Sequence, residues 1–190
     1  MKNPRVFVPL LLGVLVACAI ATVGQERPKD VKGWGKIKWG MTVDQAKKAY
    51  ADAKTGDGKR VGLLTCYVAC YVEKLAIDSL SVGDTIMQAS FETSVDSDLI
   101  EAVSLHMSLG NGMDTYAHLK DSLIQKYGLP TNQEKDQISM SNGSETLIPR
   151  FSVKWIFPST TIQLNMIGTE RTAYLSVNYT AADTEALDSL

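Results

Sequence analysis

Apolar and polar residues alternate almost strictly along three successive segments between positions 151 and 179. One side of each segment carries apolar residues: Phe151, Val153, Trp155 and Phe157, then Ile162, Leu164 and Met166, then Ala173, Leu175, Val177 and Tyr179. The other side carries Ser152, Lys154, Gln163, Asn165, Ser176 and Asn178. Such alternation is typical of antiparallel strands with one face on the core and the other in water. The sequence therefore predicts an antiparallel meander sheet with one apolar and one solvated face.

The rest of the chain predicts two helices and further strands. Thr42 and Gln45 form a capping box before a short apolar stripe, and the stretch 116–127 has the spacing of a second helix. Its apolar face consists of Tyr116, Leu119, Leu123 and Tyr127. Period-two segments between Val61 and Met107 predict strands, with Val61–Val72 as one buried strand, and Asn142-Gly143 predicts a hairpin turn. The order helix, strands, helix, strands indicates an α+β fold, with both helices packed on the antiparallel sheet.

Length and charge limit the classes of protein that this chain can belong to. The 190 residues include 19 basic and 21 acidic side chains, for a net charge of -2. The length suits one domain, and the balanced charge argues against a nucleic-acid-binding protein. We expect a linker over 22–33, a single α+β domain over 34–180 and an acidic tail over 181–190.

The first 21 residues have the three parts of a secretory signal peptide. Lys2 and Arg5 precede a short apolar run, and Ala19-Ile20-Ala21 offers a small-residue cleavage site. The alternative is a lipobox at Leu15-Val16-Ala17-Cys18, in which Cys18 would carry a lipid anchor. We therefore expect an exported protein, in the periplasm or at the outer membrane, or secreted. Its only expected link to a membrane is the lipid on Cys18.

The start of the first helix resembles that of a known group of exported proteins. Gly40-Met41-Thr42 followed by Gln45-Ala46 is similar to the helix start of small bacterial outer-membrane-assembly lipoproteins, whose compact α+β architecture is shared with secreted β-lactamase-inhibitor proteins. The match covers about ten residues, and Ala46 stands where the lipoproteins carry valine. The resemblance implies an extracytoplasmic, non-catalytic interaction domain and transfers no active-site residue.

A catalytic interpretation rests on one ridge of the second helix. Asp114, His118 and Ser122 lie four residues apart, so neighbouring side chains can touch. A hydrolase also needs an exposed nucleophile elbow and an oxyanion hole, and the sequence has no G-x-S-x-G motif. The favoured explanation is a solvated helix face opposite Tyr116, Leu119 and Leu123. The two histidines and three cysteines show no metal-ligand spacing, and no motif suggests a cofactor.

Two features are candidates for binding. Trp34 lies in a glycine-flanked segment and is expected to be exposed, whereas Trp39 and Trp155 are expected in the core. The polar side of the meander (Ser152, Lys154, Gln163, Asn165, Ser176 and Asn178) is a possible docking surface for another envelope protein. The alternative is plain solvation, because a half-exposed antiparallel sheet needs a polar side in any case.

Cys66 and Cys70 are expected to form a disulfide if the chain is exported and Cys18 is removed or lipidated. Four residues of straight strand span about 13 Å, whereas bridged Cα atoms lie within about 7 Å. A disulfide therefore requires a bend between the two cysteines. The alternative is an unbroken strand with two reduced cysteines on one face.

Together these patterns predict an exported, non-enzymatic binding or envelope-assembly module. The alternatives are a secreted hydrolase that uses Asp114, His118 and Ser122, and a carrier of a lipid or small ligand held between helix and sheet.

Overall fold

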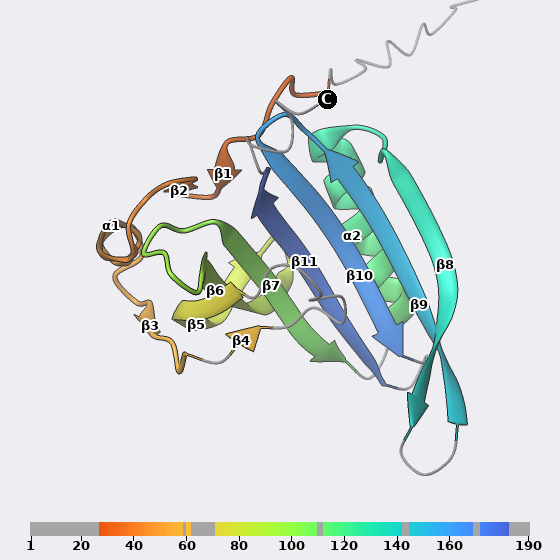
Figure 1. Ribbon diagram of the computed structural model, residues 1–190. Coiled ribbons are helices and arrows are strands. Elements are labelled where there is room, and N and C mark those ends of the chain that lie inside the picture. The colour runs from red at the N-terminus through yellow and green to blue at the C-terminus, as the bar shows by residue number, and fades with distance from the viewer. Residues whose placement is uncertain are drawn as a thin grey trace, which may run out of the picture.

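The computed structural model describes residues 27–58, 60–61, 71–109, 112–141, 145–168 and 172–182. Within these residues the fold has two helices and eleven strands (Figure 1). The helices are α1 (Val43–Ala49) and α2 (Gly112–Tyr127). The strands are β1 (Gly33–Trp34), β2 (Ile37–Lys38), β3 (Lys54–Thr55), β4 (Arg60–Val61), β5 (Tyr71–Val82), β6 (Thr85–Ser94), β7 (Ala102–Leu109), β8 (Asn132–Ser141), β9 (Glu145–Ile156), β10 (Thr160–Gly168) and β11 (Ala173–Ala181).

Most of these strands form one nine-stranded sheet. Its order is β3-β5-β6-β7-β11-β10-β9-β8, and β4 also pairs with β5. Each described pairing in this sheet is antiparallel. The predicted α+β class and antiparallel sheet are confirmed.

The predicted order of elements is wrong in its first step, because a small hairpin precedes α1. Gly33 pairs with Lys38, and Trp34 pairs with Ile37. Gly35, between the two strands, has a φ of +55°, a conformation that glycine adopts without steric cost. Strands of two residues are too short to show an alternating pattern.

Two further strand predictions need correction. β8 was not predicted, since its sequence Asn-Gln-Glu-Lys-Asp-Gln-Ile-Ser-Met-Ser has almost no apolar side. The single strand predicted over Val61–Val72 is also wrong, because Val61 and Tyr71 are partners on antiparallel strands. Residues 62–70 lie outside the described part of the chain, and so do Cys66 and Cys70.

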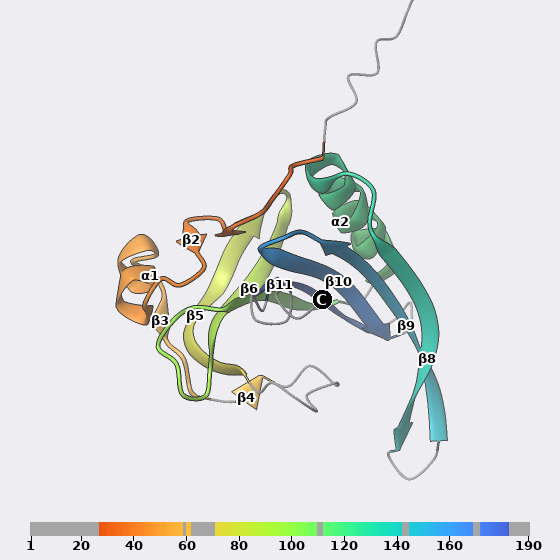
Figure 2. The same ribbon diagram turned by 45° about the horizontal axis from the view of Figure 1, so that its top comes forward.

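The capping box of α1 is confirmed. The Thr42 hydroxyl accepts a hydrogen bond from the Gln45 backbone N–H at 3.3 Å, and the Gln45 side-chain carbonyl accepts from the Thr42 N–H at 3.0 Å. Both bonds satisfy N–H groups that the first turn of a helix leaves without partners. Ala46 is the buried residue of α1, which lies beside the β5 edge of the sheet (Figures 1 and 2).

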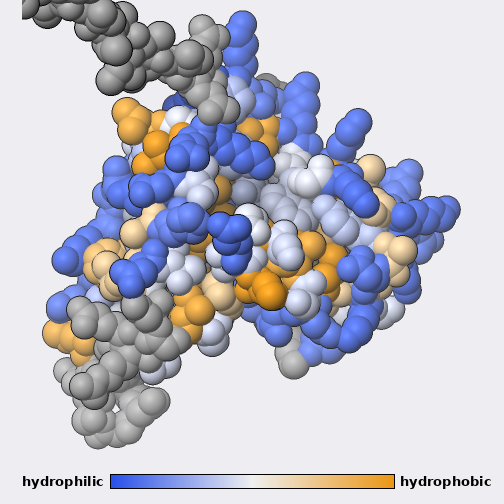
Figure 3. Space-filling view, turned by 180° about the vertical axis from the view of Figure 1, so that it is seen from behind, coloured by the Kyte–Doolittle hydropathy of each residue, from blue (hydrophilic) through white to orange (hydrophobic). Residues whose placement is uncertain are grey.

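The apolar side of the sheet is covered mainly by α2. Tyr116, Leu119, Leu123 and Tyr127 are buried, as predicted from their spacing. The helix contacts β10 and β11, and Figures 1 and 2 show it on one side of the sheet. Figure 3 shows this side of the molecule, with hydrophilic residues over much of the surface and apolar residues near the middle and at the left margin. The core predicted from the alternation of 151–179 is therefore confirmed.

The expected linker is attached to the domain over the part that the structure describes. Asp30 accepts hydrogen bonds from the Ser159 N–H at 2.9 Å and from its hydroxyl at 2.7 Å. Arg27 donates to the Ile156 carbonyl at 2.9 Å. Residues 27–33 therefore do not form a free linker, because side-chain hydrogen bonds attach them to the domain. The sequence analysis missed this, since it relied on apolar periodicity, which such bonds do not produce. Residues 1–26, which include the expected signal peptide and Cys18, lie outside the described residues, and so does most of the expected tail, 183–190.

Candidate functional site

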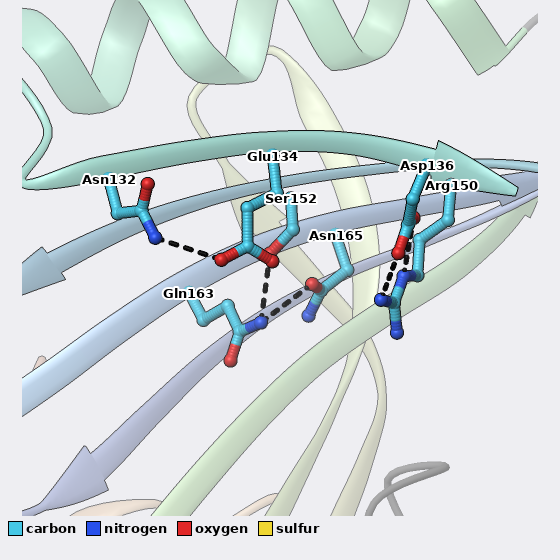
Figure 4. A network of polar contacts seen from close by, with 7 residues as sticks. All are labelled: Asn132, Glu134, Asp136, Arg150, Ser152, Gln163 and Asn165. Atoms are coloured by element: carbon cyan, nitrogen blue, oxygen red, sulfur yellow. Dashed lines mark hydrogen bonds and ion pairs between the residues drawn. The ribbon is translucent and has the colours of Figure 1, made fainter.

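The register of the sheet aligns all six candidate residues of the meander on the side away from α2. We call this side the polar face. One row across the strands consists of Gln88, His106, Ser176, Asn165, Ser152 and Glu134. The next row consists of Ser90, Ser104, Asn178, Gln163, Lys154 and Asn132. The meander thus continues as a polar surface over β6–β11, and Figure 4 shows its side chains pointing away from α2.

Much of the polar face is buried, in contrast to the solvated face expected from the alternation. Ser152, Asn165, Ser176 and Asn178 are each no more than 7% exposed, and Lys154 and Gln163 are half-buried. The border at β8 is open, where Asn132, Glu134 and Asp136 are exposed, and so is Gln88 on β6. Alternation shows which side chains share a face, but it does not show how deeply that face lies.

Hydrogen bonds join the polar side chains into a network (Figure 4). The Gln163 amide donates to the Ser152 hydroxyl at 2.9 Å and to the Asn165 carbonyl oxygen at 3.0 Å. The Asn178 amide donates to the Ser176 hydroxyl at 3.3 Å. Asn165 Nδ2 is buried and has no hydrogen-bond partner in the part of the chain that the structure describes. A buried donor without a partner costs free energy, so this amide is an exception in a network otherwise joined by hydrogen bonds.

At the border of the network the polar contacts are ionic. The Arg150 Nε donates to the Asp136 Oδ1 at 2.8 Å, and a second bond joins Arg150 Nη2 to Asp136 Oδ2. This two-point contact holds the pKa of the Asp136 carboxyl below its ordinary value. The Asn132 amide donates to the Glu134 carboxylate at 2.8 Å.

The opposite end of the polar face contains a pair of carboxyl groups that the sequence analysis missed. Glu73 on β5 lies directly opposite Glu92 on β6. Glu73 accepts a hydrogen bond from the Ser90 hydroxyl. Glu92 is only 3% exposed, and its Oε1 atom has no hydrogen-bond partner among the described residues. Burial raises the pKa of Glu92 to about 7, with a smaller contribution from the charge of Glu73, while a hydrogen bond with Ser104 opposes the rise.

Two ring-bearing residues lie near this pair. His106 is half-buried, which lowers its pKa, and the charge of Glu73 acts in the opposite direction. Tyr174 is 45% exposed, and its ring centroid lies 6.2 Å from that of His106 in a stacked arrangement. Burial raises the pKa of Tyr174, and the charge of Glu92 raises it further. The charge of Glu73 thus acts on His106, and the charge of Glu92 acts on Tyr174.

The structure does not bring the other candidate residues to this face. Trp34 is half-buried and stacks on Tyr50 with ring centroids 6.0 Å apart, so the expected exposed aromatic is in fact packed against the core. Asp114, His118 and Ser122 are exposed on α2. The core position expected for Trp155 is confirmed, whereas Trp39 is half-buried and packs against the core.

Neither metal coordination nor a known relative identifies the site. No group of three or more His, Cys, Asp or Glu side chains in the described ranges could hold a metal ion. No helix in the same ranges is long and apolar enough to span a membrane. No protein-family model, curated protein or solved structure matches the chain.

Proposed function

We propose that this chain is an exported, non-enzymatic binding module of the bacterial envelope. The signal-peptide pattern of residues 1–21 supports export, and the similarity of Gly40-Met41-Thr42 to the helix start of outer-membrane-assembly lipoproteins supports an envelope role. The partner that we propose is another envelope protein.

The unpaired amide of Asn165 is the observation that best supports binding through the polar face. Most buried polar groups in folded proteins have a partner, and the amide lies in a row of hydroxyl and amide groups that are otherwise joined by hydrogen bonds. A carbonyl oxygen from a partner would supply the missing acceptor. The exposed border at Asn132 and Glu134 offers further polar contacts around such a segment.

Charge substitution tests this proposal. In Gln163→Glu, a half-buried amide donor becomes a carboxylate that can no longer donate to Ser152 or Asn165. We expect this variant to lose the partner that the unmodified chain captures by cross-linking in its native envelope. Gln125→Glu makes the same chemical change on the exposed surface of α2 and is the matched control. Retained capture by Gln163→Glu, or equal loss in both variants, would refute docking at the polar face.

The mode of attachment is proposed separately. Release after Ala21 gives a soluble protein, whereas a lipid on Cys18 anchors it to a membrane. Cys18→Ser, followed by detergent partitioning of the exported protein, distinguishes the two. Unchanged partitioning would exclude the anchor.

Binding of a small ligand is a second candidate function. The unpaired oxygen of Glu92 favours it, because a buried carboxylate oxygen without a donor can accept a hydrogen bond from a small ligand. This ligand site differs from that of the expected carrier. A carried lipid would lie between helix and sheet, whereas Glu92 is on the polar side of the sheet, away from α2.

A further inference from the structure

A break in strand pairing brings the two carboxyl groups of Glu73 and Glu92 together. Glu73 pairs with Glu92, but Leu75 pairs with Phe91, so Lys74 is an extra residue on β5. In a regular strand, residues 73 and 75 would share a face, because side chains alternate with a period of two. The extra residue instead places Glu73 on the polar face while Leu75 stays in the core. Bulges of this kind often lie next to functional sites, where they redirect a side chain.

Gly56 makes a second local adjustment around Glu73. Its N–H donates to the Lys74 carbonyl at 2.8 Å, which holds the end of β3 against the bulge. A Cβ atom at position 56 would lie 2.8 Å from the Glu73 Cγ and from its carbonyl oxygen. Only glycine therefore allows this close approach without a shift of the neighbouring chain.

The resulting arrangement is unfavourable without a ligand. Directly opposed residues on antiparallel strands have Cβ atoms roughly 5 Å apart, and like charges at such positions are destabilising. Ser90 satisfies one oxygen of Glu73, yet Glu92 Oε1 is buried with no partner in the described ranges. The nearby lysines on this edge are engaged elsewhere: Lys54 with Asp78 and Lys74 with Asp98. The unpartnered Glu92 oxygen and the negative charge of the two carboxylates are thus in the same place.

We propose that Glu73 and Glu92 form a binding site for a primary alkylammonium group. An ammonium group supplies the N–H donor that Glu92 Oε1 lacks and the positive charge that a pair of carboxylates favours. A metal ion fits less well, because the described residues contain no third carboxylate, histidine or cysteine placed to complete its ligand set. Guanidinium is wider and prefers a planar two-point contact, whereas ammonium is a compact point charge. The inference does not depend on the protein-docking role of the Gln163 region.

The other groups that interact with the carboxyl pair are compatible with this ligand. Ser104 on β7 forms a hydrogen bond with the Glu92 carboxyl. His106, from the same strand, has a lowered pKa and is therefore mainly neutral near neutral pH, so it does not repel a cation. Tyr174 on β11 presents an uncharged aromatic ring, and aromatic rings attract cations.

Binding of the cation must be linked to release of a proton. The pKa of Glu92 is about 7, so at about pH 6 most molecules carry a proton on this carboxyl. An ammonium ion binds the ionised form, so Glu92–COOH and R–NH₃⁺ give Glu92–COO⁻···⁺H₃N–R and a free proton. Close to one proton is released per ligand at about pH 6, and almost none at about pH 9, where the carboxyl is already ionised.

Calorimetry and carbon NMR on the exported full chain test the site with n-butylammonium as the probe. We expect saturable binding with proton release at about pH 6, detected in buffers of different ionisation enthalpy. The side-chain carboxyl resonance of Glu92 should move towards its ionised position at the same ligand concentrations. Tetramethylammonium has the charge but no N–H donors, and 1-butanol has neither the charge nor an N–H donor. Both should bind at least about tenfold more weakly, because hydrogen bonds to charged groups contribute strongly.

Variants locate the binding on the chain. Glu92→Gln should weaken n-butylammonium binding by about tenfold or more and abolish proton release. Glu134→Gln removes an exposed carboxylate from the same polar face and should change neither. Equal binding of tetramethylammonium, or unchanged binding by Glu92→Gln, would refute the site. If Glu92→Gln does not fold, the wild-type resonance decides: a Glu92 carboxyl that titrates with pH but does not respond to n-butylammonium binds a proton only, which overturns the proposal.

Discussion

Replacing Glu92 with Gln should change the pH dependence of stability. Glu92 lies 3% exposed, and burial raises the pKa of its carboxyl from 4.5 to about 7. Glutamine has nearly the same shape and keeps a side chain that can bond with Ser104, but it does not ionise. The substitution therefore removes the titration while it preserves most of the packing.

The sign and size of the effect follow from proton linkage. Because the pKa is raised by folding, the folded state binds more protons than the unfolded state between pH 4.5 and about 7, and stability falls as pH rises through this window. At about 1.4 kcal/mol per pH unit, the difference between 4.5 and about 7 amounts to roughly 3 kcal/mol. We therefore compare the unfolding free energy of Glu92→Gln with that of the wild type at each pH. Between about pH 4 and about pH 8, this difference should shift by about 3 kcal/mol in favour of the variant.

Urea unfolding followed by tryptophan fluorescence, repeated from about pH 4 to about pH 8, measures this difference. Glu134→Gln serves as the control, because Glu134 is exposed and its removal should alter stability little at any pH. A free-energy difference between wild type and Glu92→Gln that stays constant across this range would refute the reasoning. It would mean that the buried carboxyl does not titrate in the folded protein.

Three substitutions test the packing that supports the sheet, each by urea or thermal unfolding. Trp155→Ala should cost about 3–5 kcal/mol, because the indole is fully buried and donates to the Gly128 carbonyl at 2.8 Å; a cost below about 1 kcal/mol would contradict its role in the core. Gly112→Ala should lower the free energy of unfolding by about 1–3 kcal/mol, because the new Cβ would lie 2.2 Å from the Ala173 Cβ. An unchanged melting temperature would contradict this, because it would mean that α2 moves to make room at no cost. Thr42→Ala should cost about 1 kcal/mol through loss of the helix cap, whereas Thr42→Ser should retain most of it.

The sequence predicted those elements whose burial leaves a local periodic pattern. The strands of 151–179 and the apolar face of α2 each place a large side chain in the core at every second position or every third or fourth position. This is why Trp155, Leu164 and Leu175, all fully buried, could be placed before the structure was known. The cap at Thr42 was predictable for a related reason, because both of its hydrogen bonds form between residues three apart.

Elements held by distant contacts left no such pattern. β8 is an edge strand that is exposed over 132–137. It forms through its pairing with β9 along ten residues and has almost no apolar alternation of its own. Asp30 is fixed by Ser159, which lies 129 positions away in the sequence. Local sequence cannot indicate contacts of this kind, so residues 27–33 read as a linker.

The carboxyl pair illustrates the same division between local and long-range information. Glu92 directly follows Phe91 in the alternation of Met87, Ala89 and Phe91, so its place on the polar face was within reach of the sequence. Glu73 was not, because a regular alternation would give it the same face as the buried Leu75, and only the extra residue Lys74 separates them. An opposed pair of carboxylates is destabilising, and the ammonium ion that we propose at this site would offset that cost.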